Sequence, residues 1–189
     1  DGRTALSSGS ADGTENAVIW WDLATGAEIR RLEGFGVGAA FGVQASVGTV
    51  YGITFAPDGH TAYTASMDRT LRLWNLDTSE ELHRYDMTQY PLSVALSPDG
   101  AKLVVYSTMF YTHILDRETW TLQRRFGTRS GAGGMWDVVS DGRTAVLGND
   151  ELGITFVDIA SGKTIYRLDA HTSVVNAVVI SADGRYALS

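Results

Sequence analysis

Apolar and polar residues alternate in short runs along most of this chain. Ahead of four successive Asp-Gly pairs, apolar residues recur at every second position; these residues are Ile53 and Phe55, Val94 and Leu96, Trp136 and Val138, and Val178 and Ile180. A period of two places such side chains on one face of a β-strand. No stretch of ten or more residues carries an apolar stripe with the period of a helix. The pattern therefore predicts an all-β chain.

The Asp-Gly pairs predict tight turns that recur at a nearly constant distance. Their aspartates are Asp1, Asp58, Asp99, Asp141 and Asp183, with spacings of 57, 41, 42 and 42 residues. Glycine tolerates positive φ and an aspartate bonds to nearby backbone, so the pair suits a hairpin turn. A second anchor follows each of the first four pairs; these anchors are Trp21-Asp22, Trp74-Asn75, Leu115-Asp116 and Val157-Asp158. Anchors in register indicate a repeat of about 42 residues.

Each repeat predicts an antiparallel sheet of four strands. The strand before the Asp-Gly turn is followed by three more, which read TAYTAS, LRLWNL and EELHRYD in the second repeat. The last of these strands is the most polar in every repeat. The predicted units cover approximately residues 1–35, 36–88, 89–128 and 129–170, and residues 171–189 begin a further one. We treat residues 1–189 as one segment of repeats.

Three short motifs and the repeat length resemble WD40 repeats. The motifs are the SPDG turn at 97–100, the LWNL strand at 73–76 and the DLATG run at 22–26. The stretch HTSVVNAVVISADGRYALS, from His171, is similar to the opening half of such a repeat. The tandem, partly degenerate repeats resemble the bacterial type of this family. The resemblance implies a β-propeller with four-stranded antiparallel blades around a central channel.

The resemblance also implies a hydrogen-bond network inside each blade, built from a His, a Ser or Thr, an Asp and a Trp. The residues that match these roles here are Asp12, Trp21, Ser66, Asp68, Trp74 and His171. Ser46 stands where the second unit should have its His, and Leu115 and Val157 replace the Trp in the later units. We expect those later blades to depend on apolar packing instead.

By the same resemblance, the chain is expected to be a non-catalytic scaffold that binds a protein or peptide on the top face, around the channel. The candidate partner-binding residues are Tyr51, Met67, Leu92, Thr108, Gly134, Met135, Asp150 and Asn176. They differ from unit to unit, as a recognition surface would, and neutral drift explains the same variation. The glycine-rich insertion from Gly34 to Gly52 is either a flexible connection or a binding loop.

Composition and motifs point away from several other classes of protein. Net charge is −7, which disfavours nucleic acid and anionic membranes as partners. The chain has no cysteine, and its four histidines, His60, His83, His113 and His171, lack metal-ligand spacing. We therefore predict no metal, no cofactor and no catalytic residue. The alternative, a propeller enzyme with a site at the channel mouth, would need charged residues or histidines where Tyr51, Leu92, Gly134 and Asn176 stand.

The two ends of the chain are nearly the same, DGRTALS at 1–7 and DGRYALS at 183–189. Overlapping ends are expected for a segment of a larger ring of seven or eight blades, and this is the interpretation that we favour. The partners would then include the missing blades of the same chain. A self-contained ring of four blades and a self-assembly module that closes a ring with a second copy are the alternatives.

Overall fold

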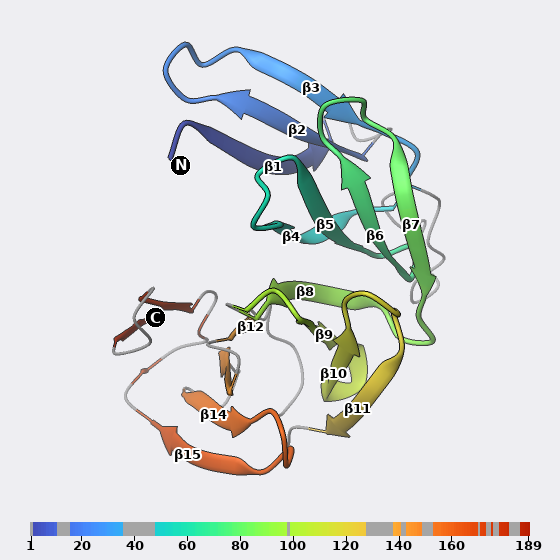
Figure 1. Cartoon of the computed structure of the whole chain (residues 1–189). Helices are drawn as coiled ribbons and strands as arrows, with labels where there is room; N and C mark the ends of the chain where they lie inside the picture. The colour runs from blue at the N-terminus through green and yellow to red at the C-terminus, as the bar shows by residue number, and fades with distance from the viewer. Residues whose placement is uncertain are drawn as a thin grey trace. The chain divides into compact units, whose positions relative to one another are not determined.

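The computed structural model describes the chain in two compact units, Asp1–Pro91 and Leu92–Ser189, within which the strands form separate antiparallel sheets (Figure 1). The described residues are 2–10, 16–35, 48–97, 99–127, 138–140, 143–148, 153–169, 171–172, 175, 178–181 and 186–189. The only helical element among them is the single 3-10 turn η1 (Thr108–Phe110). The predicted all-β class is therefore confirmed.

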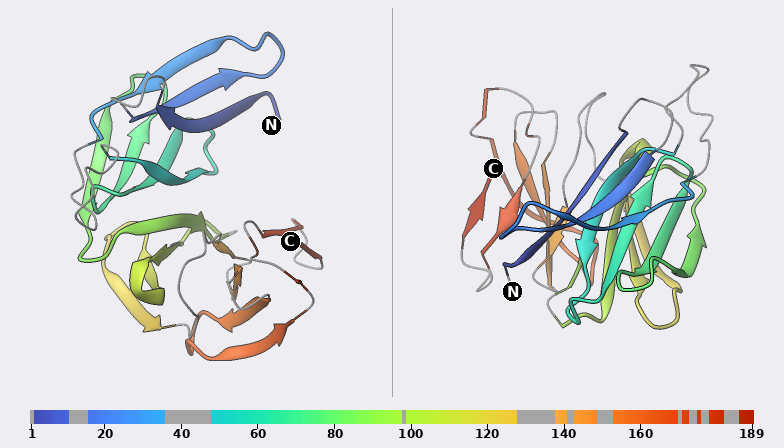
Figure 2. Two further views of the ribbon diagram at one scale, coloured as in Figure 1. Left: turned by 180° about the vertical axis from the view of Figure 1, so that it is seen from behind. Right: turned by 90° about the horizontal axis from the view of Figure 1, so that it is seen from above.

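The first unit contains two sheets in which neighbouring strands follow one another along the chain. The first sheet has the order β1-β2-β3, formed by β1 (Thr4–Ser10), β2 (Asn16–Asp22) and β3 (Glu28–Leu32). The second has the order β4-β5-β6-β7, formed by β4 (Val50–Phe55), β5 (Thr61–Ser66), β6 (Thr70–Asn75) and β7 (Glu81–Asp86). Figure 2 shows the same succession of strands from behind.

The second unit repeats this meander. One sheet consists of β8 (Pro91–Leu96), β9 (Lys102–Ser107), β10 (Tyr111–Asp116) and β11 (Leu122–Gly127), with η1 between β9 and β10. Another consists of β12 (Val138–Ser140), β13 (Thr144–Gly148), β14 (Ile154–Asp158) and β15 (Thr164–Leu168). The short strands β16 (Val179–Ile180) and β17 (Ala187–Leu188) form a two-stranded sheet. Each sheet lies within one predicted repeat, and the repeat boundaries themselves stay a prediction.

Carboxylate and amide side chains close the turn that precedes the outermost strand in each of the four larger sheets. Asp116 Oδ1 accepts hydrogen bonds from the backbone N–H of Thr119 (2.9 Å) and from its hydroxyl (2.9 Å). Asp22 and Asp158 do the same for the Thr or Ser three residues later, and Asn75 bonds the backbone of Thr78. These bonds favour the ionised carboxylate and lower the pKa of the three aspartates. The repeated polar anchor is thus a turn cap.

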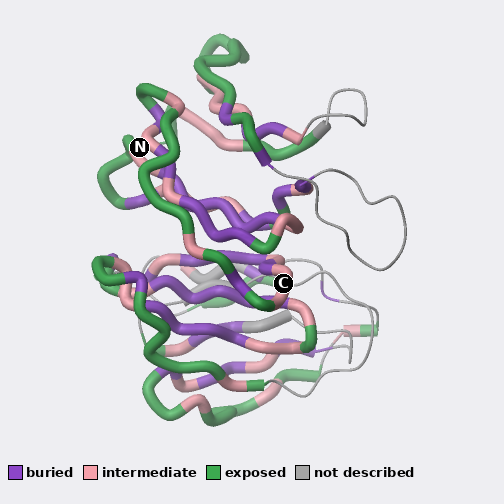
Figure 3. The backbone as a smooth tube through the Cα atoms, turned by 90° about the vertical axis from the view of Figure 1, so that its right-hand side faces the viewer, coloured by how far each residue is buried: buried purple, intermediate pink, exposed green. Residues whose placement is uncertain are grey.

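The core of each unit lies between its sheets, and the outermost strands are the most exposed (Figure 3). In the first unit, Val18 and Leu32 of the first sheet pack with Val50, Trp74 and Leu76. In the second unit, one cluster joins residues of both four-stranded sheets, namely Ala95, Val104, Tyr106, Ile114, Ala145, Val157 and Ile159. Most of β7 and β11 is exposed, as expected for polar strands at a sheet edge.

Candidate functional site

The turn between β5 and β6 is held by the side chain of Asp68. Its Oδ1 accepts hydrogen bonds from the backbone N–H (3.0 Å) and the hydroxyl (2.5 Å) of Thr70, and its own N–H donates to Ser66 Oγ (3.2 Å). Arg69 in this turn has a positive φ of 68°. Three hydrogen bonds therefore hold the turn, although it contains no glycine.

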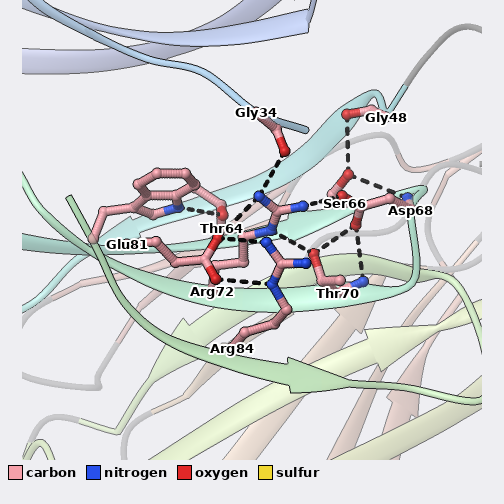
Figure 4. A network of polar contacts seen from close by, with 10 residues as sticks. Gly34, Gly48, Thr64, Ser66, Asp68, Thr70, Arg72, Glu81 and Arg84 are labelled. Carbon is pink, nitrogen blue, oxygen red and sulfur yellow. Dashed lines mark hydrogen bonds and ion pairs between the residues drawn. The ribbon is translucent and has the colours of Figure 1, made fainter. Parts of the chain in front are cut away.

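A buried arginine ties this turn to the outer strand (Figure 4). The side chain of Arg72 on β6 is only 2% exposed and forms ion pairs with Asp68 and with Glu81 of β7 (Nη1 to Oε2, 3.1 Å). Arg84 completes the network by donating to both oxygens of Glu81 (2.8 and 2.9 Å). These bonds, that from Arg84 above all, lower the pKa of the Glu81 carboxyl. The charges balance, which a buried guanidinium requires.

The same network contacts the connection between β3 and β4 near both of its ends. Arg72 Nη1 donates to the carbonyl of Gly34 (2.9 Å), and its guanidinium lies 5.0 Å from the centre of the Phe35 ring. At the other end, Ser66 Oγ donates to the carbonyl of Gly48 (3.0 Å). Residues 36–47 lie outside the described residues. The connection between β3 and β4 therefore leaves and returns at fixed points beside the β5–β6 turn.

The indole of Trp74 bonds a threonine that the sequence analysis did not single out. Its Nε1 donates to Thr64 Oγ1 (2.9 Å), whereas the hydroxyl of Ser66 bonds Gly48. In the first sheet, Trp21 Nε1 donates in the same way to Ser7 Oγ (2.7 Å). Trp21 pairs across the sheet with Ala5, and Trp74 pairs with Ala62. In both sheets the hydroxyl belongs to the residue two positions after this partner.

The sequence does contain a signal for this pairing, because the two positions change together. Where Leu115 replaces the tryptophan, the corresponding second-strand residue is Val105; where Val157 replaces it, that residue is Leu147. An indole N–H that is buried needs an acceptor, and an aliphatic side chain does not. An alignment of the repeats at these two positions therefore indicates Thr64 and Ser7 as the partners of Trp74 and Trp21.

The turn between β9 and β10 is braced differently. Ser107 and His113 are both buried, and Ser107 Oγ lies 3.0 Å from His113 Nε2 and 3.2 Å from the carbonyl oxygen of Tyr111. Burial, reinforced by the nearby charge of Arg125, lowers the pKa of His113 to about 4. The imidazole is therefore neutral at pH 7, and the pair joins the two strands beneath the turn. Because Ser107 is buried, it does not present its hydroxyl to a substrate in solution.

The candidate partner-binding residues fall in different surroundings. Tyr51 on β4 is 39% exposed, Met67 in the β5–β6 turn is half-buried, and Thr108 begins η1. Leu92 packs against the core cluster of the second unit. Gly134, Met135, Asp150 and Asn176 lie outside the described residues, as does Asp12. The structure thus describes Met67 and Thr108 at the equivalent turns of two sheets, and the partner-binding role of all eight stays a prediction.

Two of the other histidines, His60 and His171, lie near polar partners. His171 Nε2 lies 2.6 Å from Ser189 Oγ, and Ser189 corresponds in the repeat to Ser7 and Thr64. His60 is exposed and its Nδ1 lies 2.9 Å from Asp77 Oδ2. Within the described part of the chain, no group of three or more potential ligands is arranged to hold a metal ion. No helix in that part is long and apolar enough to cross a membrane.

Two stretches of the chain, residues 43–75 and 162–189, match the family model described as WD domain, G-beta repeat. These two stretches are WD40 repeats. The first WD40 match ends at Asn75, the last residue of β6, and the second begins in the turn before β15. The antiparallel sheets are those expected of WD40 propeller blades, so the resemblance seen in the sequence is confirmed.

Curated proteins are similar to this chain over most of its length. Eukaryotic translation initiation factor 3 subunit I of Candida albicans is 23% identical over 176 residues, covering 83% of the chain and 46% of that protein. Human striatin is 27% identical over 152 residues, covering 74% of the chain and 20% of striatin. A Danio rerio protein, p21-activated protein kinase-interacting protein 1-like, is 28% identical over 137 residues, covering 72% of the chain and 36% of that protein.

The chain spans less than half the length of these three relatives. All three relatives come from eukaryotes, so the comparisons do not support the bacterial type that the sequence analysis expected.

Proposed function

We propose that this chain is a non-catalytic scaffold that binds a protein or peptide at the turn ends of its sheets, on the top face of the propeller to which its blades belong. The turn end of a sheet is the end that carries the β5–β6 or the β9–β10 turn. The WD40 match supports this class of function, and one relative is named for an interaction with a protein kinase. Propeller blades are antiparallel sheets, and loops held on such a rigid scaffold often carry binding residues.

One observation carries the proposal, namely the clamping of the glycine-rich connection at the turn end of the second sheet. Seventeen residues separate β3 from β4, whereas four separate β7 from β8. The long connection is held at Gly34 by Arg72 and at Gly48 by Ser66. A long loop with fixed ends on a rigid sheet is a common way to present recognition residues. A simple linker would not need a buried charged network at its base.

The test is a selection of twelve-residue random peptides displayed on phage against the immobilised chain. Enriched peptides are synthesised and their affinities are measured by fluorescence polarisation. We expect Met67→Ala and Thr108→Ala, at the turn ends, to weaken at least some of these peptides about tenfold, as loss of a contact residue does. Asp77→Ala, in the turn at the opposite end of the second sheet, is the matched control and should leave every affinity unchanged.

Two results would contradict the proposal. The first is that no peptide is enriched over a selection against an unrelated β-protein. The second is that the enriched peptides respond to Asp77→Ala and not to the turn-end variants. Either result would show that the turn ends are not the binding surface.

A second candidate function is self-association, which is favoured by the sheets that have fewer than four described strands. Among the described strands, β1 pairs only with β2, so one edge of β1 is open, and β16 pairs with β17, whose sequence repeats that of β1. Strand β16 of one copy would pair with β1 of another in place of β17, with Ile180 opposite Ala5 as it is opposite Ala187 within one copy. Light scattering should then give a multiple of 20.4 kDa that grows with concentration. A constant 20.4 kDa would exclude it.

A further inference from the structure

The turn between β9 and β10 holds two successive residues in a conformation that side chains disfavour. Met109 has φ 61° and ψ 22°, and Phe110 has φ 62°; both are in the left-handed region that normally selects glycine or asparagine. The Met109 side chain is 73% exposed. Strained backbone that is maintained without an evident structural benefit is often found at functional positions.

Met109 does not hold its turn by polar bonds, in contrast to the residue at the same position of the β5–β6 turn. Met109 occupies the position of Asp68, which holds its turn by bonds to Thr70 and Arg72. The β9–β10 turn is instead held at its base by the buried pair of Ser107 and His113. The Met109 side chain is therefore free to serve another purpose.

The base of this turn is rigid on both sides. Phe110 packs against the core cluster of the second unit, and Ser107 Oγ lies within hydrogen-bond distance of the carbonyl oxygen of Tyr111. Both flanking strands are paired throughout, from Tyr111 with Ser107 to Asp116 with Lys102. Met109 is thus presented from a pre-organised support, which lowers the entropy cost of binding through it.

Beside this turn lies an arginine that differs from its counterparts in the other sheets. The four outer strands β3, β7, β11 and β15 carry an arginine at the same position: Arg31, Arg84, Arg125 and Arg167. Across the sheet these arginines pair with Ile19, Arg72, His113 and Thr155, respectively. Arg31 pairs with Glu28, Arg84 with Glu81 and Arg167 with Asp169. Arg125 has no ion pair within the described residues, and its guanidinium lies 4.7 Å from the centre of the Tyr111 ring. No carboxylate among the described residues therefore neutralises its charge.

We propose that Met109, Tyr111 and Arg125, here called the Met109 surface, bind an acidic peptide segment of a partner protein, with an apolar side chain of the segment against Met109 and Tyr111 and a carboxylate on Arg125. This rests on the proposed scaffold function and adds the site and the chemistry of the partner. Methionine is unbranched and polarizable and is frequent at binding surfaces. Arginine matches a carboxylate with two parallel hydrogen bonds and is enriched among residues that dominate binding.

The experiment uses the peptides enriched from the phage library. Their affinities are measured for the unchanged chain, for Met109→Gly and for Arg125→Gln. Two matched controls accompany them. Ser79→Gly removes another left-handed residue, in the β6–β7 turn. Arg124→Gln removes a neighbouring charge on β11, from an arginine that bonds the carbonyl of Ser161.

We expect the enriched peptides to share an apolar residue near an Asp or Glu and to bind both Met109→Gly and Arg125→Gln at least tenfold more weakly. The two control variants should keep their affinity. Met109→Gly should also raise Tm by about 2 °C, because glycine relieves the left-handed strain. A variant that is more stable and binds less well separates loss of a contact from loss of the fold.

The possible outcomes distinguish the two proposals. Enriched peptides that depend on Met67 or Thr108 but bind Met109→Gly and Arg125→Gln unchanged would overturn the Met109 surface and leave the scaffold function standing. Enriched peptides without acidic residues would also overturn it. A selection that yields no peptide at all would overturn both.

Discussion

Acid should destabilise this chain through one buried histidine. His113 is 5% exposed and its pKa is about 4 in the folded chain, against an ordinary value of 6.5. Burial is the larger cause, and the positive charge of Arg125 adds to it. Below pH 6.5 the unfolded chain takes up a proton on this residue while the folded chain does not. Stability is therefore complete above the ordinary pKa and is lost as the pH falls from 6.5 towards 4.

The size of the effect follows from the two pKa values. A pH of 5 lies about 1.5 units below the ordinary histidine pKa but above the pKa of His113 in the folded chain. Each pH unit in this range changes the free energy of unfolding by about 1.4 kcal/mol. Between pH 8 and pH 5, His113 should therefore lower the free energy of unfolding by about 2 kcal/mol. The aspartates that cap turns have lowered pKa values, so they stay ionised over this range.

Urea unfolding followed by circular dichroism at pH 8 and pH 5 measures this loss. His113→Gln keeps a polar partner for Ser107 but does not titrate, so its loss should be about 2 kcal/mol smaller than that of the unchanged chain. His83→Gln, at an exposed position on β7, is the control and should behave like the unchanged chain. Equal losses for the unchanged chain and His113→Gln would refute the reasoning.

Two further predictions concern the first unit. Arg72→Met should lower the free energy of unfolding by about 3–5 kcal/mol, because it leaves the buried carboxylate of Asp68 without its partner; Arg31→Met, which breaks an exposed ion pair, should cost less than about 1 kcal/mol. Trp74→Phe and Thr64→Val should not be additive: the double variant, which loses donor and acceptor together, should be about 1 kcal/mol more stable than the sum of the single changes predicts.

Urea unfolding of each variant checks both predictions. Similar small losses for Arg72→Met and Arg31→Met would mean that Asp68 is hydrated and that the network does not brace the turn. If the stability losses of Trp74→Phe and Thr64→Val were strictly additive, the hydrogen bond between the two residues would not contribute to stability.

Local sequence pattern was sufficient for most of the fold. The period of two predicted β4 and β8 before their Asp-Gly turns. The polar anchors Asp22, Asn75, Asp116 and Asp158 correctly marked the end of the strand that precedes each outermost strand. These features succeed because a strand and its turn are determined by residues a few positions apart. The same locality explains why the sequence placed Met67 and Thr108 in turns between second and third strands.

The side-chain partners were harder to predict. Ser66 was selected for the blade network, yet Trp74 bonds Thr64; both residues lie on the same face of β5, and only the bond in the folded sheet distinguishes them. Nothing in the sequence indicated that Arg72 would be buried, since arginine is usually exposed. Its acceptors come from the turn before it, from β7 and from Gly34, which is 38 residues away.

What the sequence determined by itself is the succession of strands and turns and its period, because alternation and turn chemistry act over a few residues. The tertiary structure alone decided which charges are buried, which tryptophans find a hydroxyl and which turn carries strain. Arg72 is buried because two carboxylates and a carbonyl meet around it, and Arg125 differs from its counterparts because none of the described carboxylates pairs with it. Such differences depend on residues that are distant in sequence and become neighbours only when the sheets pack.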